Sequence, residues 1–105
     1  MLFEFRHYKL QDDKRDEWVS FMESTIIPFQ QSQGMSVLGS FIDEEDPNSY
    51  HWIRRFRDEE ERVAQYADVY ESDTWKNEIA PKIPEMIDKV VVVRRLIPTD
   101  HSGLQ

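Results

Sequence analysis

The chain of 105 residues contains no cysteine and only three glycines. The absence of cysteine excludes disulfides, thiolate zinc sites, iron–sulfur clusters and a cysteine nucleophile. The glycines form neither a G-x-G-x-x-G loop nor a Walker loop, so we do not expect a dinucleotide- or nucleotide-binding enzyme. No serine occurs in a G-x-S-x-G elbow, so serine hydrolase chemistry has no support.

Positive charge and long apolar runs are also scarce. No run of twenty apolar residues occurs, so we expect no membrane insertion. The net charge is −8, from 21 acidic and 13 basic residues, which argues against nucleic acid as a partner. No basic and apolar leader precedes the strand-like pattern that begins at Leu2, so we expect a cytoplasmic protein.

The apolar residues that are present suffice for one folded domain. Leu, Ile, Val and Phe make up 27 of the 105 residues, and disorder becomes the better expectation only below roughly 20%. Chains usually split into several domains only well beyond this length. We therefore predict a single domain over residues 1–98, followed by a flexible polar tail over residues 99–105.

The spacing of apolar residues predicts four strands and two main helices. Residues 2–10 alternate between two faces, as in a strand, whereas Trp18, Met22 and Ile26 recur at the spacing of a helix. The predicted strands cover residues 2–10, 35–43, 50–57 and 89–97. The predicted helices cover residues 14–33 and 58–70, with a further short helix around Trp75 and Ile79.

Single residues mark where these elements bend, start or end. Pro28 cannot donate a backbone N–H and predicts a bend or loosening in the first helix, which we expect Gly34 to end. Gly39 predicts a bulge in the second strand. Asp58 and Glu61 have the spacing of a capping box and predict the start of the second main helix.

The element order predicts an α+β fold of the ferredoxin-like class, βαββαβ. Its simplest form is a four-stranded antiparallel sheet with both main helices on one face. If the first and third strands pair with their centres aligned, Glu4 lies opposite Arg54 and Arg6 lies opposite Trp52. We therefore predict an ion pair between Glu4 and Arg54.

The second face of the sheet also needs cover. Residues 90–93 form an unbroken apolar run, the pattern of a strand buried on both sides. By alternation we assign five further residues to the face away from the helices: Leu2, Tyr8, Tyr50, Trp52 and Phe56. We expect the sheet of a second copy to cover this face in a homodimeric barrel, although the run could instead pack under the C-terminal tail.

Four short motifs follow one another along the chain. They are E-x-R-x-Y at Glu4, Arg6 and Tyr8, W-x-R-x-F at Trp52, Arg54 and Phe56, E-E-R at Glu60, Glu61 and Arg62, and Y-x-S-x-x-W at Tyr70, Ser72 and Trp75. With these motifs, residues 2–97 resemble the NIPSNAP family of the dimeric α/β-barrel superfamily. The chain departs from that family in its first turn, where the family often has a glycine and this chain has Gln11, Asp12 and Asp13.

The resemblance implies a ferredoxin-like protomer and a homodimeric barrel. It implies no single activity, because the superfamily includes cofactor-free monooxygenases, isomerases, haem-linked enzymes and many members without a known function. We expect no cofactor in this chain.

The predicted binding site lies on the face that we assign to the barrel. Its residues are Arg6, Tyr8, Trp52, Arg54, His51 and Arg94. Arg6 or Arg54 would hold the negative charge of a small, planar, anionic or phenolic ligand. Arg94 is preferred to Arg95 because it shares even numbering with the other site residues. The alternative is that the Glu4–Arg54 pair and the aromatic rings only fix the strand register.

Two histidines form a weaker candidate site. His7 and His51 would lie opposite each other on the helix side of the sheet, so His51 would have to reach round the rim to join the binding site. They lack a clear third ligand, and we expect no metal.

Two classes of function remain. The first is a homodimeric barrel that binds a small anionic or aromatic molecule, with a cofactor-independent monooxygenase or isomerase as its enzymatic form. The second is a structural or dimerisation module whose barrel is filled by its own side chains. A void of roughly 300 Å³ or more would distinguish the first class from the second.

Overall fold

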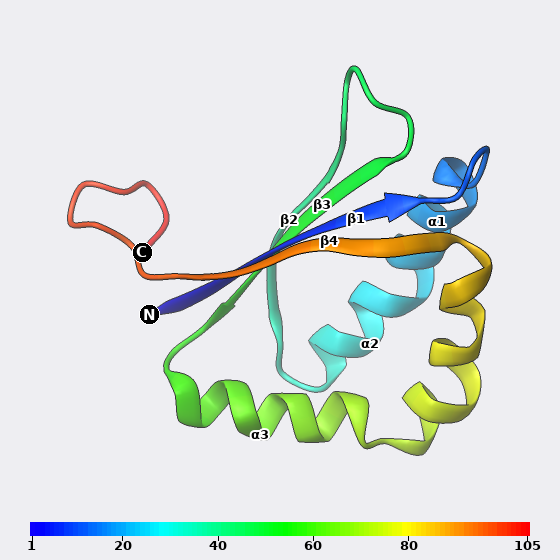
Figure 1. Cartoon of the computed structure of the whole chain (residues 1–105). Coiled ribbons are helices and arrows are strands. Elements are labelled where there is room, and N and C mark those ends of the chain that lie inside the picture. Colours follow the sequence, from blue (N-terminus) through cyan, green and yellow to red (C-terminus); the bar gives the residue numbers. More distant parts are fainter.

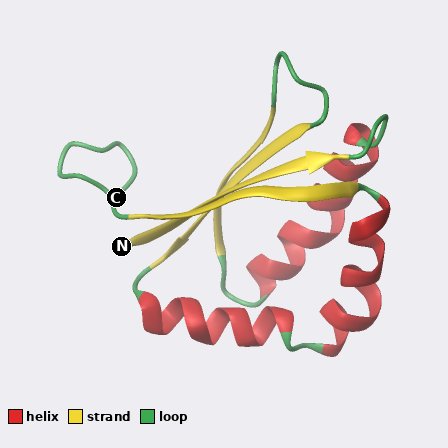
Figure 2. Ribbon diagram, in the orientation of Figure 1, coloured by secondary structure: helices red, strands yellow, loops and turns green.

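The computed structural model covers residues 1–105 and shows a four-stranded antiparallel sheet with all helices on one face (Figures 1 and 2). The strand order in the sheet is β2-β3-β1-β4. The strands are β1 (Leu2–Leu10), β2 (Ser36–Ile42), β3 (Ser49–Phe56) and β4 (Ile87–Leu96). The predicted ferredoxin-like fold class is confirmed. None of the helices has the length and apolar character needed to cross a lipid bilayer.

The first predicted helix is an almost continuous rod made of three segments. They are α1 (Arg15–Phe21), the π-helical turn η1 (Met22–Ile26) and α2 (Ile27–Ser32). Pro28 has no N–H to donate to the carbonyl of Ser24, and the wide turn η1 lies directly before it. The chain leaves the helix at Gly34, whose φ of 98° is the left-handed conformation that glycine adopts without strain.

The second helical segment begins at α3 (Glu59–Tyr70). The Asp58 carboxylate caps it by accepting a hydrogen bond from the Glu61 backbone N–H at 2.8 Å. The Ser72 hydroxyl accepts a hydrogen bond from the Trp75 N–H at 3.1 Å and starts the short segments that follow. These are η2 (Trp75–Ile79) and the 3₁₀ helix η3 (Ala80–Glu85), which lead into β4.

Two positions have irregular local backbone geometry, one in the first turn and one in β2. Asp13 has a φ of 62° in the first turn. Asp is one of the few residues that tolerate this conformation. The predicted bulge in β2 is confirmed between Val37 and Gly39. A Cβ on Gly39 would lie 2.5 Å from the ring of Phe41, so a larger residue there would require that ring to move.

The predicted pairing of β1 with β3 is confirmed. Glu4 lies opposite Arg54, Arg6 opposite Trp52, and Tyr8 opposite Tyr50. This register matters because paired residues point to the same face of the sheet.

The predicted orientation of the two faces is wrong. Residues with even numbers in β1 and β3 lie against the helices and form the helix face. The Tyr8 ring lies 6.0 Å from the Trp18 ring of α1, and Phe56 packs with Val69 of α3. Alternation separates the two faces of a strand but does not tell which one the helices cover. The bulkier face, with Tyr50, Trp52 and Phe56, packs against the helices.

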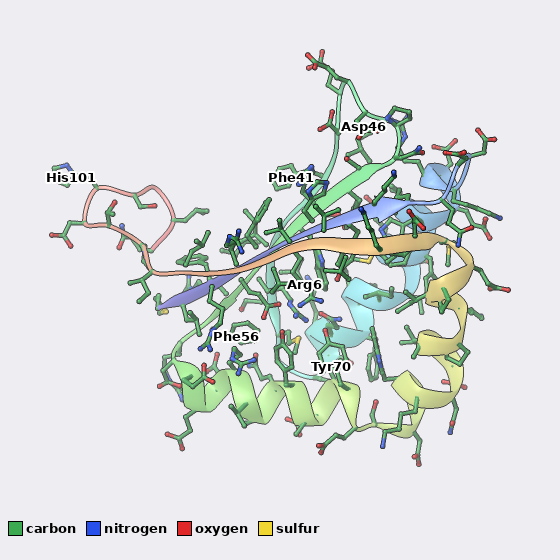
Figure 3. All side chains as sticks on the ribbon, in the orientation of Figure 1. Arg6, Phe41, Asp46, Phe56, Tyr70 and His101 are labelled. Carbon is green, nitrogen blue, oxygen red and sulfur yellow. The ribbon has the colours of Figure 1, made fainter.

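The opposite face of the sheet carries no helix, and we call it the open face (Figure 1). Its rings come from the odd-numbered residues: Phe5 and His7 of β1 and His51 of β3 are half-buried. Phe41 of β2 is 51% exposed and lies on the side away from the helices (Figure 3).

The predicted two-sided burial of residues 90–93 is not found within one chain. Val90, Val91 and Val93 are 49%, 43% and 40% exposed, because β4 is an edge strand of the sheet.

Gly34, which follows α2, allows a test of the positive φ at this position. We expect Gly34→Ala to lower the free energy of unfolding by about 1–2 kcal/mol, because an alanine in the left-handed conformation is strained. Gly103→Ala is the matched control, since a Cβ there meets no atom within 4 Å. Urea unfolding of both variants measures the difference, and equal stabilities would show that Gly34 does not need its positive φ.

Candidate functional site

Two opposite charges lie in the core between the sheet and the helices. Glu4 of β1 and Arg54 of β3 are 2% and 0% exposed, and their side chains form an ion pair. The two residues meet because β1 and β3 are neighbours in the sheet and the register places them opposite each other. A buried pair of this kind is tolerated only when its remaining hydrogen-bonding capacity is also filled.

The helices supply the additional hydrogen bonds. Arg54 Nη1 donates to Gln30 Oε1 of α2 at 3.0 Å and to the Tyr70 hydroxyl of α3 at 2.7 Å. Arg54 Nη2 donates to the Tyr66 hydroxyl at 3.0 Å. Tyr66 in turn donates to Glu4 Oε2. The guanidinium therefore links β1, β3 and both helical segments.

Both members of the ion pair stay charged. Burial by itself would raise the pKa of Glu4, but the charge of Arg54 and its hydrogen bond outweigh burial, so this pKa lies below its ordinary value. Burial opposes the charge on Arg54 as well, and the surrounding phenols and Glu4 keep its pKa above the ordinary value.

A second arginine extends this cluster toward the solvent. Arg6 Nη1 donates to Glu4 Oε1 at 3.2 Å, and Arg6 Nε donates to the Tyr8 hydroxyl at 2.8 Å. Burial opposes its charge, but Tyr8 and Glu4 outweigh this effect and raise the pKa of Arg6. Since two guanidiniums share one carboxylate, the cluster has a surplus of one positive charge. The Arg6 side chain, 19% exposed, is the more accessible of the two.

Next to Arg6 lies a cavity of about 380 Å³ between the sheet and the helices, which we call the inner cavity. The residues that line it are Arg6, Tyr8, Trp18, Met22, Ile26, Trp52, Tyr66, Tyr70, Trp75, Ile83, Ile87 and Val90. Arg6 is the only charged residue among them. Figure 3 shows Arg6 reaching from the sheet and Tyr70 reaching from α3 into the space between the layers. One of the lining residues, Val90 of the edge strand β4, is half-exposed.

Three of the predicted ligand-binding residues line the inner cavity: Arg6, Tyr8 and Trp52. Arg54 lies behind its wall, where Glu4 and the phenols occupy its hydrogen bonds. These three residues therefore lie together on the helix side of the sheet, and not on the face assigned to the barrel.

Two predicted residues do not reach the inner cavity. His51 lies on the open face, where it pairs with His7. Arg94 also lies on the open face, opposite Phe5, so the preference for Arg94 over Arg95 is wrong. Arg95 points to the helix side, but there it forms an ion pair with Glu59.

The sequence interpretation missed the residues that the helices contribute. Trp18, Tyr66, Tyr70 and Trp75 line the inner cavity, but none of them is among the predicted ligand-binding residues. A signal was present, because Tyr66 and Tyr70 are one helical turn apart and place two phenols on the buried side of α3. Buried phenols need hydrogen-bond partners on the facing strand.

The histidine pair forms a separate cluster on the open face. The rings of His7 and His51 stack with their centroids 4.2 Å apart. His7 Nε2 lies 3.2 Å from the Ser49 hydroxyl, and His51 Nε2 lies 3.9 Å from Asp43 Oδ2. Burial and the nearby His7 lower the pKa of His51. No group of three or more metal-ligating side chains occurs in the structure.

A wider hollow of about 510 Å³ lies at the surface. It is lined by Asp12, Asp13, Arg15, Asp16, Pro47 and Asn48. Because none of these residues is hydrophobic, the hollow lacks the apolar walls that ligand sites usually have. The inner cavity is the better candidate.

Comparisons with known proteins give a family and a fold. The family model described as NIPSNAP matches residues 3–102. The chain is similar to a NIPSNAP family protein with unknown function from Agrobacterium tumefaciens, with 24% identity and a TM-score of 0.89 over 100% of this chain and 94% of that one. No match is found among curated proteins.

Two more solved structures share the fold. An uncharacterized NIPSNAP domain protein from Burkholderia xenovorans is 17% identical, with a TM-score of 0.86 over 97% of this chain and 98% of that one. An antibiotic biosynthesis monooxygenase is 15% identical, with a TM-score of 0.69 over 94% and 99% of the two chains. At these identities the likeness establishes a common fold and not a common activity.

The Glu4–Arg54 pair makes a direct prediction about stability. Glu4→Leu leaves Arg54 without a carboxylate in the core, and Arg54→Met leaves Glu4 with Arg6 as its only charged partner. We expect each change to cost about 3–5 kcal/mol. We expect the double variant to cost clearly less than the sum of the two. Urea unfolding of the four proteins gives the coupling energy.

The control is the same cycle at the exposed pair of Lys14 and Glu17, whose charged atoms are 3.1 Å apart. Its coupling should not exceed about 1 kcal/mol, because water screens it. Additive losses at Glu4 and Arg54 would contradict the role of this pair in the core.

Proposed function

This chain belongs to the NIPSNAP family, and from that premise we propose that it binds a small, planar anion in the inner cavity. The observation that carries the proposal is a mostly apolar cavity of about 380 Å³ with one charged residue, Arg6, in its wall. Apolar walls bury a ring, and a single guanidinium then selects a carboxylate or another oxyanion.

The electrostatics of the neighbouring cluster support an anionic ligand. Glu4 neutralises one of two nearby arginines, Arg54 is fully buried, and Arg6 lies at the cavity wall. A bound anion would therefore balance the surplus positive charge. A neutral or cationic ligand would leave that charge uncompensated in a poorly solvated place.

The size of the void also favours a binding function over a purely structural one. The inner cavity exceeds the roughly 300 Å³ expected for a ligand site. It lies under the helices, so it does not depend on whether a barrel between two copies is filled by side chains.

Arg6→Met tests the ligand. A thermal-shift screen with 2-naphthoate and other aromatic acids should identify compounds that stabilise the wild type, by about 1.4 kcal/mol at ten times their Kd. We expect Arg6→Met to weaken binding at least about tenfold, because a hydrogen bond to a charged group contributes about 1.5–3 kcal/mol.

Arg94→Met is the matched control for this screen. It removes the same charge from the open face, opposite Phe5, and should leave the binding of 2-naphthoate unchanged. An equal loss of 2-naphthoate binding in both variants would show that the effect comes from net charge alone. If no aromatic acid stabilises the wild type, the proposed binding function is wrong.

We further propose that the open face packs against the same face of a second copy in a homodimer. Phe41 and Leu96 are 51% and 48% exposed there, and Phe5, Ile53 and Val92 are half-buried beside them. A soluble chain rarely leaves such a continuous aromatic and aliphatic surface without a partner. One surface that pairs with itself gives an isologous dimer.

Val92→Asp tests the dimer. Its side chain lies on the open face opposite His7, and a carboxylate there would lose its hydration in the interface. We expect sedimentation at micromolar concentration to give about twice 12.6 kDa for the wild type and one chain mass for the variant. Val63→Asp, at an exposed position of α3, should remain dimeric. A monomeric wild type at tens of micromolar would disprove the proposal.

A further inference from the structure

The polar groups around the inner cavity include more hydrogen-bond donors than acceptors. Arg6 and Arg54 can only donate, and Glu4 is the only carboxylate in the cluster. Glu4 already accepts from both arginines and from Tyr66. Two buried atoms in this region, Arg54 Nε and Trp18 Nε1, have no partner, and both are donors.

The hydroxyl of Tyr70 has a free proton as a result. Its oxygen accepts from Arg54 Nη1 at 2.7 Å and from Gln30 Nε2 at 3.5 Å. The orientation of the Gln30 amide is fixed, because its Oε1 accepts from the same guanidinium at 3.0 Å. The Tyr70 O–H has no acceptor within the protein, and Tyr70 lines the inner cavity.

The hydroxyl of Tyr8 also has a free proton. Its oxygen accepts from Arg6 Nε at 2.8 Å, and its own proton has no acceptor within the protein. Burial raises the pKa of Tyr8, so the phenol keeps this proton at neutral pH. Tyr66 differs, because its proton is donated to Glu4. Arg6 Nη2 also makes no hydrogen bond within the protein and adds a charged donor.

We infer that the inner cavity binds a weakly acidic aromatic compound, a phenol or an enolisable carbonyl compound, as its oxyanion in preference to the neutral acid. This inference rests on the proposed function and adds the protonation state of the ligand. The donors are Arg6, Tyr8 and Tyr70, which one chain of hydrogen bonds connects through Glu4 and Arg54.

The preference follows from what each form of the ligand can do at this wall. An oxyanion accepts hydrogen bonds from the free donors and balances the surplus charge. A neutral phenol would bring one more proton to a wall whose phenol oxygens already accept from arginines. In an apolar cavity without such donors the order would be reversed, because burial disfavours the charged form.

The test uses 4-nitrophenol, which ionises near neutral pH and whose phenolate absorbs visible light. All three tryptophans of the chain line the inner cavity, so quenching of their fluorescence reports binding. Absorbance titration of the bound probe reports its protonation state. A tenfold preference for the phenolate lowers the midpoint of this titration by about one pH unit relative to the free probe.

Tyr70→Phe removes one donor and keeps the ring. We expect it to bind the probe and to move the titration midpoint back toward that of the free probe, whereas Arg6→Met should raise the midpoint above it. Tyr50→Phe is the control, since the Tyr50 hydroxyl bonds to Ser40 and does not line the inner cavity. A loss of stability alone would change the melting temperature but not the titration of a bound probe.

The possible results separate the two proposals. If 4-nitrophenol binds the wild type with an unchanged or raised midpoint, the preference for the oxyanion is wrong and the proposed binding site stands. If neither 4-nitrophenol nor any aromatic acid binds at any pH, the proposed function itself is wrong. If Tyr70→Phe keeps the full shift, Tyr70 is not one of the donors and the assignment of the wall is overturned.

Discussion

The guanidinium of Arg54 has no exposed surface, and a charge in such a place is tolerated only when it is paired and hydrogen-bonded. Its partners come from three directions: Glu4 from β1, Gln30 from α2, and the phenols of Tyr66 and Tyr70 from α3. Each of these elements must hold its position for the charge to be satisfied. The same interaction thus fixes the strand register, the face that the helices cover and the position of α3.

The inner cavity derives its polarity from this cluster. Arg54 uses the lone pairs of Tyr66 and Tyr70, and Arg6 uses that of Tyr8. A phenol whose oxygen accepts from an arginine can donate its own proton to another group. Tyr66 donates its proton to the Glu4 carboxylate. A structural need in the core, the satisfaction of two guanidiniums by one carboxylate, therefore also determines which ligand atoms the wall can bind.

Much of the fold was predictable from local patterns, and the bounds of the strands agree within two residues. Strand alternation also indicated that Glu4 and Arg54 face each other. It could not show which face the helices cover, because both faces carry aromatic residues. The assumption that even-numbered residues of all strands share one face failed for Arg94. Which residues of β4 face the helices depends on the register of β4 with β1, and in that register Arg94 lies opposite Phe5. The phenols of α3 were missed because helical spacing identifies a buried stripe without the polar groups at its tips.

The two faces of the sheet border different surfaces, the inner cavity and the open face, and β4 borders both. The inner cavity lies on the helix side, between the sheet and the helices. The open face, with Phe41 and the stacked histidines, contributes nothing to it. β4 borders both, since Val90 lines the inner cavity while Val92 points to the open face. Packing of a second copy on the open face would therefore act on the cavity through β4, the strand that borders both.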